Sequence, residues 1–228
     1  MQKNYLVTLL TSLLVIGACS NKTTTSNSSR LQIRYRVQAG ANKGGITENT
    51  NLKLVEGASI DAYSGATRTG VNIGAHAVIP LKRNSIETGL DYMYNNQTFT
   101  YSDVTNGYEG TRKVNLSQIM LPVTYSIPLF RKRLEGGLFQ VKLGYLAQVN
   151  IYGIKSSNAT LPKYSTKSFT NGFTVGISST PITLGSGLKL GFYIDGYRGT
   201  QAYEDFYNRS EFETAGTSFM KYGIILEF

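Results

Sequence analysis

The stretch Leu31-Gln-Ile-Arg-Tyr-Arg-Val-Gln-Ala39 alternates apolar and polar residues along its whole length. Every odd position is apolar, and the even positions hold Gln32, Arg34, Arg36 and Gln38. A period of two is typical of a β-strand, because successive side chains point to opposite faces of the sheet. This stretch therefore predicts a strand with one apolar face and one polar face.

Seven further segments show the same alternation, at residues 71–79, 86–94, 119–127, 139–151, 169–177, 188–194 and 220–228. In the third of these, the preceding Val114 and Leu116 are out of phase with Ile119, which predicts a β-bulge near Ser117 and Gln118. The connections 80–85, 128–137 and 180–187 are short, whereas 42–69, 96–113, 153–167 and 198–217 are long. No segment has a convincing helical pattern. The fold predicted is an all-β, eight-stranded antiparallel up-and-down barrel, since closure removes the sheet edges.

The polar faces of these strands indicate which side of the barrel faces inward. They carry nine charged residues, five positive and four negative, which we expect to form ion pairs in the lumen: Arg34, Arg36, Glu87, Asp91, Lys142, Lys189, Asp195, Lys221 and Glu227. The chain also ends on Phe228, with Leu226, Ile224 and Tyr222 preceding it in steps of two. This ending resembles the C-terminal insertion signal of outer-membrane barrels. Together with the alternating loop lengths, these features favour a transmembrane barrel with its apolar face toward lipid.

A lipidated lipocalin-like barrel is the alternative, in which the apolar face would turn inward around a ligand. Lipocalins carry a Gly-x-Trp motif near their first strand, and this chain has no Trp.

Residues 1–18 predict an export signal, with Lys3 before an apolar run that is too short to cross a bilayer. The run ends in Ile16-Gly17-Ala18-Cys19, which resembles the lipobox of bacterial lipoproteins and implies acylation, including palmitate, at Cys19. Ordinary signal-peptide cleavage beside an incidental Cys is the alternative. Residues 19–30 are polar and without periodicity, so we expect a flexible tether before a barrel over residues 31–228.

The composition of the 228-residue chain excludes several protein classes. Its 16 Tyr, 10 Phe and 41% hydrophobic residues are too many for a disordered chain. A single Cys rules out a disulfide scaffold, and one Cys with one His argues against a structural zinc site. We predict no metal and no cofactor.

The net charge of +9 falls to +8 once Lys3 is removed, and much of the positive excess lies in the short turns, where anionic lipid headgroups could contact it. Export makes nucleic acid an improbable partner.

His76 is the only candidate for catalytic chemistry. It lies on the polar face near a short turn, and we expect it to be bonded to Asp91 or Glu87 in the lumen. A lipid-modifying outer-membrane enzyme that uses His76 is the competing hypothesis. The lipid A deacylases of that kind carry a His-x-Ser-Asn motif. In this chain Ala77 and Val78 follow His76, so the motif is not matched. We therefore predict no catalytic residue.

The barrel region resembles the small outer-membrane β-barrel proteins of Bacteroidota, the PorT-like group. The resemblance rests on Ser85–Tyr94, Gln118–Tyr125, Gly144-Tyr145 and the closing Tyr222–Phe228. The lipobox departs from the usual signal peptide of that group. The resemblance implies a barrel in the bacterial outer membrane and carries no catalytic residues over to this chain.

The sequence thus predicts a non-enzymatic outer-membrane lipoprotein with both termini in the periplasm. We expect a filled lumen, with Arg34, Arg36, Met93, Met120 and Tyr193 pointing inward. Such a barrel would serve as a structural or accessory subunit that binds a protein partner through its extracellular loops or its wall. The loops 101–108 and 203–207 are aromatic and polar, which suits protein contact or an interfacial aromatic belt.

Overall fold

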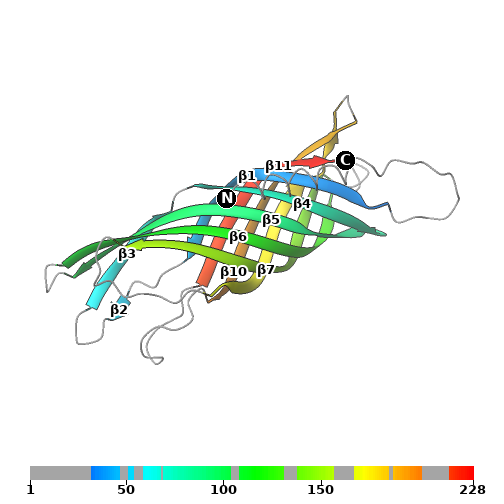
Figure 1. The fold of residues 1–228 in the computed structure, drawn as a ribbon. Coiled ribbons are helices and arrows are strands. Elements are labelled where there is room, and N and C mark those ends of the chain that lie inside the picture. The colour runs from blue at the N-terminus through cyan, green and yellow to red at the C-terminus, as the bar shows by residue number, and fades with distance from the viewer. Residues whose placement is uncertain are drawn as a thin grey trace, which may run out of the picture.

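In the computed structural model, eight long strands form an antiparallel barrel (Figure 1). The structure describes residues 32–46, 51–53, 59–67, 69–103, 108–130, 138–156, 167–184, 187–201 and 216–228. The barrel strands are β1 (Arg34–Ile46), β4 (Gly70–Leu81), β5 (Asn84–Asp103), β6 (Tyr108–Leu129), β7 (Phe139–Ser156), β8 (Phe169–Ser179), β10 (Lys189–Gln201) and β11 (Gly216–Glu227). Among these residues no helix has the length and apolar character needed to span a bilayer.

Each barrel strand pairs with its neighbours in chain order, and β1 pairs with β11 to close the ring. The closing register runs from Arg36 opposite Glu227 to Ile46 opposite Thr217. All neighbouring pairs are antiparallel, so the predicted up-and-down barrel is confirmed.

The two faces of the barrel wall have opposite character. Leu143, Val175 and Phe192 on the outer face are 62%, 57% and 61% exposed, whereas Arg36, Glu87 and Lys142 on the inner face are buried. A soluble lipocalin-like barrel needs the reverse arrangement, with apolar side chains around an internal ligand. The observed arrangement is that of a transmembrane β-barrel, whose strands alternate apolar-out and polar-in.

The strands are longer at one end of the barrel than the sequence predicts. The predicted long connection 96–113 is mostly strand, because β5 and β6 pair as far as Asp103 opposite Tyr108. Two short strands, β2 (Asn51–Lys53) and β3 (Ser59–Thr67), extend this sheet beside β5 within the predicted connection 42–69. Figure 1 shows this extension running past the barrel, at the end opposite the C-terminus. At the turn end, β9 (Ile182–Thr183) pairs with β10.

The predicted bulge near Ser117 and Gln118 is wrong. β6 pairs with β7 in one unbroken register from Arg112 opposite Ser156 to Leu129 opposite Phe139. Val114 and Leu116 are out of phase because both point into the lumen, where they are fully buried. They pack in the lumen beside the buried amides of Asn95 and Gln97, so the apolar pattern changes face without an inserted residue.

Candidate functional site in the filled lumen

The lumen near the turn end holds a cluster of ion pairs around Glu227 and Glu87. Glu227 receives hydrogen bonds from Arg36 Nε at 2.7 Å, Arg34 Nη1 at 3.2 Å and Lys189 Nζ at 3.1 Å. The Arg36 guanidinium also donates to Glu87 Oε2 at 2.9 Å. Arg36 on β1 therefore joins the last strand, β11, to β5 across the closing seam of the barrel.

His76 lies further into the lumen, between two carboxylates. Its Nδ1 is 2.7 Å from Glu87 Oε1, and its Nε2 is 2.8 Å from Asp91 Oδ1. Because a carboxylate only accepts, each ring nitrogen donates, which is the pattern of an imidazolium. Asp91 also accepts a hydrogen bond from Lys221 Nζ on β11. His76 thus links the two carboxylates.

Another ion pair lies on the opposite wall of the barrel. Lys142 Nζ on β7 is 3.0 Å and 3.2 Å from the two carboxylate oxygens of Asp195 on β10. The ammonium group also lies 5.6 Å from the ring centre of Tyr193. The buried charges of the described residues then balance, with four cations against four anions: Arg36, His76, Lys142 and Lys221 against Glu87, Asp91, Asp195 and Glu227. Such balance and close pairing are what permit charges to remain in a water-poor interior.

Glycines make room for this network. A Cβ atom added to Gly74 would lie 1.7 Å from Asp91 Oδ1, and one added to Gly176 would lie 2.0 Å from Asp195 Oδ1. Both glycines sit on the inner face, next to the carboxylates. The interior of an eight-stranded barrel is just wide enough to be filled by side chains. The carboxylates therefore occupy the space that a side chain at each glycine position would need.

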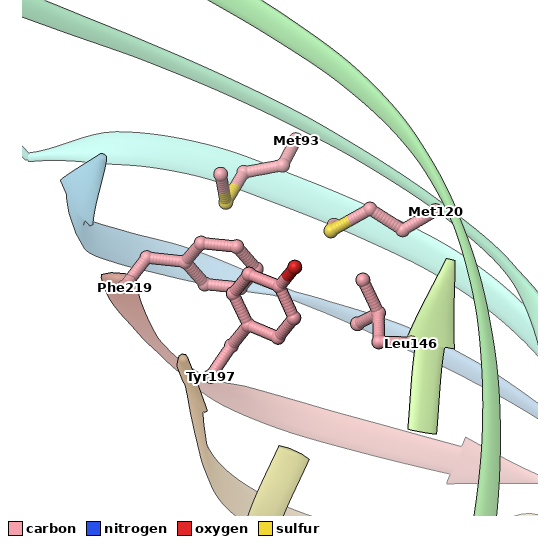
Figure 2. Packing of buried hydrophobic residues seen from close by; sticks show 5 residues of the cluster. All are labelled: Met93, Met120, Leu146, Tyr197 and Phe219. Atoms are coloured by element: carbon pink, nitrogen blue, oxygen red, sulfur yellow. The ribbon is translucent and has the colours of Figure 1, made fainter. Parts of the chain in front are cut away.

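Above the ionic layer, apolar side chains close the lumen (Figure 2). Tyr197 and Phe219 stack with ring centres 4.6 Å apart, and Met93, Met120 and Leu146 pack against them from the facing strands. All five are at most 4% exposed. We call these five residues the apolar plug.

A layer of amides and hydroxyls lies beyond the plug, toward the long loops. Gln118 Nε2 donates to Asn150 Oδ1 at 2.6 Å, and Asn150 Nδ2 donates to Thr170 at 2.7 Å. On the other side of the lumen, Asn95 donates to Asn42 at 2.6 Å. The lumen is therefore ionic at the turn end, apolar in the middle and amide-rich at the loop end.

The structure brings all nine predicted lumen charges into this network, with Arg34 and Lys189 half-buried at its rim. Met93, Met120 and Tyr193 also point inward. Of the amide layer, Asn150 and Thr170 lie on the predicted polar faces of 139–151 and 169–177, whereas Gln118, Asn42 and Asn95 lie just beyond the predicted segments. The sequence pattern does not predict the hydrogen bonds between them. In the described part of the chain, no group of three His, Cys, Asp or Glu side chains has the arrangement of a metal site.

The C-terminal residues singled out from the sequence lie on the outer face of the barrel. Tyr222, Ile224 and Phe228 are 39%, 51% and 65% exposed, and Leu226 is partly exposed beside them. The backbone amide of Phe228 donates to the Tyr35 carbonyl oxygen at 2.9 Å, so the end of the chain is tied to the first strand. Cys19, the signal over 1–18 and the tether over 19–30 lie outside the described residues.

Outer-membrane proteins are among the known structures to which this chain is similar. Over 86% of this chain and 95% of the other, the fold is similar to the outer membrane protein OprG from Pseudomonas aeruginosa, with a TM-score of 0.49 and 10% identity. AlkL, solved in lipid bilayers, is similar over 91% of this chain and 96% of its own (TM-score 0.40, 12% identity). Ail, the attachment invasion locus protein of Yersinia pestis, is similar over 86% and 98% (TM-score 0.38, 7% identity). No protein-family model and no curated protein matches the sequence.

Proposed function

We propose that this chain is a non-enzymatic barrel of the bacterial outer membrane that serves as a structural or accessory subunit. The observation that carries the proposal is the orientation of the barrel wall. Its apolar side chains face outward, and its charged side chains form ion pairs in the lumen. Lipidation at Cys19 would hold the N-terminus at the periplasmic leaflet, beside the first strand. A protein partner would bind through the extracellular loops or the lipid-facing wall, because binding residues concentrate in loops on rigid scaffolds.

The filled lumen argues against a pore. Ions would have to pass the apolar plug, and each buried charge already has an oppositely charged neighbour. An open channel would need the Tyr197–Phe219 stack to separate. We expect the purified chain to give no steady conductance in planar bilayers, and a stable open conductance would count against a scaffold role.

The competing enzyme hypothesis gives His76 a catalytic role. A catalytic base needs a free ring nitrogen within reach of the proton it removes. Both nitrogens of His76 instead face carboxylates, and the side chain is buried below the apolar plug. The His76→Ala variant separates the hypotheses, because an unchanged outer-membrane lipid profile is expected for a scaffold. A missing or new lipid species in that variant would support the enzyme.

Membrane insertion is tested by electrophoresis and fractionation. We expect the folded protein to migrate differently in detergent gels before and after boiling, and to stay in the membrane fraction when Cys19 is replaced by Ala. Release of the Cys19→Ala variant into the soluble fraction would contradict an integral barrel. Intact-mass measurement of the mature N-terminus tests lipidation separately, since an unmodified Cys19 removes that part of the proposal.

A further inference from the structure

Two lysines lie directly opposite each other on the outer face of the barrel. Lys113 of β6 and Lys155 of β7 are register partners, and both side chains are exposed. Like charges directly opposite on neighbouring strands destabilise the pairing. No carboxylate contacts either lysine in the part of the chain whose side chains the structure describes. The pairing therefore concentrates positive charge at one place on the outer face.

The described charges are distributed unequally between the two faces of the wall. The four acidic residues whose side chains are described, Glu87, Asp91, Asp195 and Glu227, are all buried in the lumen. At the loop end, the outer face carries only cations among the described side chains: Lys43, Lys113, Lys155 and Arg198. Lys113 and Lys155 are the pair that adjacent strands bring together, so the positive charge is densest there.

The height of the two lysines is set by the apolar band below them. On β6 the outward residues are apolar from Leu129 to Ile119, ten residue steps. At about 3.3 Å per residue and a tilt of about 40°, these steps span roughly 25 Å, the height of a lipid-facing band. Lys113 lies six residues beyond Ile119, and Lys155 lies four residues beyond the exposed Ile151. On the same geometry their backbones lie roughly 10–15 Å above the band.

Polar, uncrowded positions surround the pair. Thr98 of β5 lies opposite Lys113 on its other side, and Asn115 follows it on the same face. Asn115 is opposite Gly153, and an added Cβ at Gly153 would lie 3.9 Å from Asn115 Nδ2. The missing side chain at Gly153 leaves space between Lys155 and the apolar Ile151. A hydroxyl, an amide and two ammonium groups thus border one surface patch beyond the apolar band, with the lysine backbones roughly 10–15 Å above it.

We propose that Lys113 and Lys155 bind the phosphate of an anionic glycolipid in the outer leaflet. This inference rests on the proposed membrane location and on the long loops facing outward. The headgroup layer of a glycerophospholipid bilayer is only about 5–7 Å thick on each side, which is less than the height of the lysines. A phosphorylated sugar headgroup is bulkier and extends further from its acyl chains, which brings anionic groups closer to that height. Its acyl chains would lie against the apolar stripe that ends at Ile119 and Ile151.

Native mass spectrometry of the folded full-length protein tests the proposal. The probes are lipid A, dephosphorylated lipid A and phosphatidylglycerol. We expect lipid A to bind, with at least tenfold weaker binding of the other two and of lipid A to the Lys113→Gln/Lys155→Gln variant. The Lys43→Gln/Arg198→Gln variant loses the same charge elsewhere on the outer face, so it should bind lipid A as the unmodified protein does. The Lys113→Arg/Lys155→Arg variant should retain binding.

Equal weakening in the two Gln variants would overturn the proposal, because diffuse positive charge would then explain the binding. Equal binding of phosphatidylglycerol and lipid A would overturn it as well. Stability provides a second measurement, since Lys155→Gln removes a like-charge contact. Its unfolding midpoint should rise or stay unchanged in zwitterionic detergent and fall relative to the unmodified protein when lipid A is present. Heat-dependent gel mobility of each variant shows separately whether the barrel is folded, so failure of lipid binding is distinguishable from failure of the membrane proposal.

Discussion

Replacing Asp91 with Asn removes one charge from the centre of the lumen while keeping the size of the side chain. Asp91 accepts hydrogen bonds from His76 and from Lys221, and the side chains of Asp91 and Lys221 are each 4% exposed. Removing one partner of a buried pair leaves the other charge uncompensated, which costs about 3–5 kcal/mol. We therefore expect Asp91→Asn to lower the free energy of unfolding by about that amount.

The same reasoning predicts that removing both partners is less harmful than removing one. A Lys221→Met substitution in the Asp91→Asn background takes away the stranded ammonium group. The double variant should recover most of the stability, since a buried ion pair contributes little net free energy compared with apolar residues of similar volume. A double-mutant cycle should then give a coupling of about 3 kcal/mol or more between the two sites.

The assay is urea unfolding of the barrel in detergent micelles, followed by tyrosine fluorescence and by the folded band in unboiled gels. Lys189→Gln is the matched control, because Lys189 also pairs with a carboxylate but is 37% exposed. Glu227 keeps Arg36 in that variant, so the loss should stay below about 1 kcal/mol. An Asp91→Asn loss as small as the control, or a double variant no more stable than Asp91→Asn, would refute this account of the lumen.

Three other perturbations follow from the same structure. Val175→Arg places a charge on the exposed apolar wall and should cost about 2–4 kcal/mol in lipid vesicles, measured by urea titration; a neutral effect would contradict lipid contact at this position. Gly74→Ala should destabilise the barrel by about 1–3 kcal/mol in the same titration, because its Cβ would overlap the Asp91 carboxylate. Gly187→Ala is the comparison variant, because its Cβ would meet no neighbouring atom and only its backbone φ of +81° is strained. Leu146→Ala should cost about 2–5 kcal/mol by opening a cavity in the apolar plug, and planar-bilayer recordings show whether that cavity also admits ions.

The alternation of the strands was enough to predict the barrel and the charged residues of its lumen. Once Arg36 and Glu87 are assigned to polar faces, closure brings those faces together, whatever the exact register. Alternation also assigns His76 to the polar face, because its neighbours Ala75 and Ala77 belong to the apolar face. These predictions depend on period and parity, which are local properties of the chain.

Features that depend on register or length could not be read in the same way. The hairpin between β5 and β6 continues to Asp103 and Tyr108 because backbone pairing extends through polar residues, which no apolar pattern marks. The sequence pattern at Val114 and Leu116 is the same for two different structures. Two apolar residues that face the lumen and one inserted residue produce the same break in alternation. Only the filling of the lumen distinguishes the two.

The pairing of Lys113 with Lys155 shows how the register of two strands decides which side chains meet on the outer face. The two residues are 42 positions apart, and a shift of two residues between β6 and β7 would keep both side chains outside while separating them. In the observed register the repulsion is retained, although the two-residue shift would relieve it without changing which face is buried. The register is fixed by the lumen, where Gln118 is bonded to Asn150 and Gly144 lies against Thr124. The inner face therefore imposes the lysine pair on the outer face, and an anion from the membrane is what would offset its repulsion.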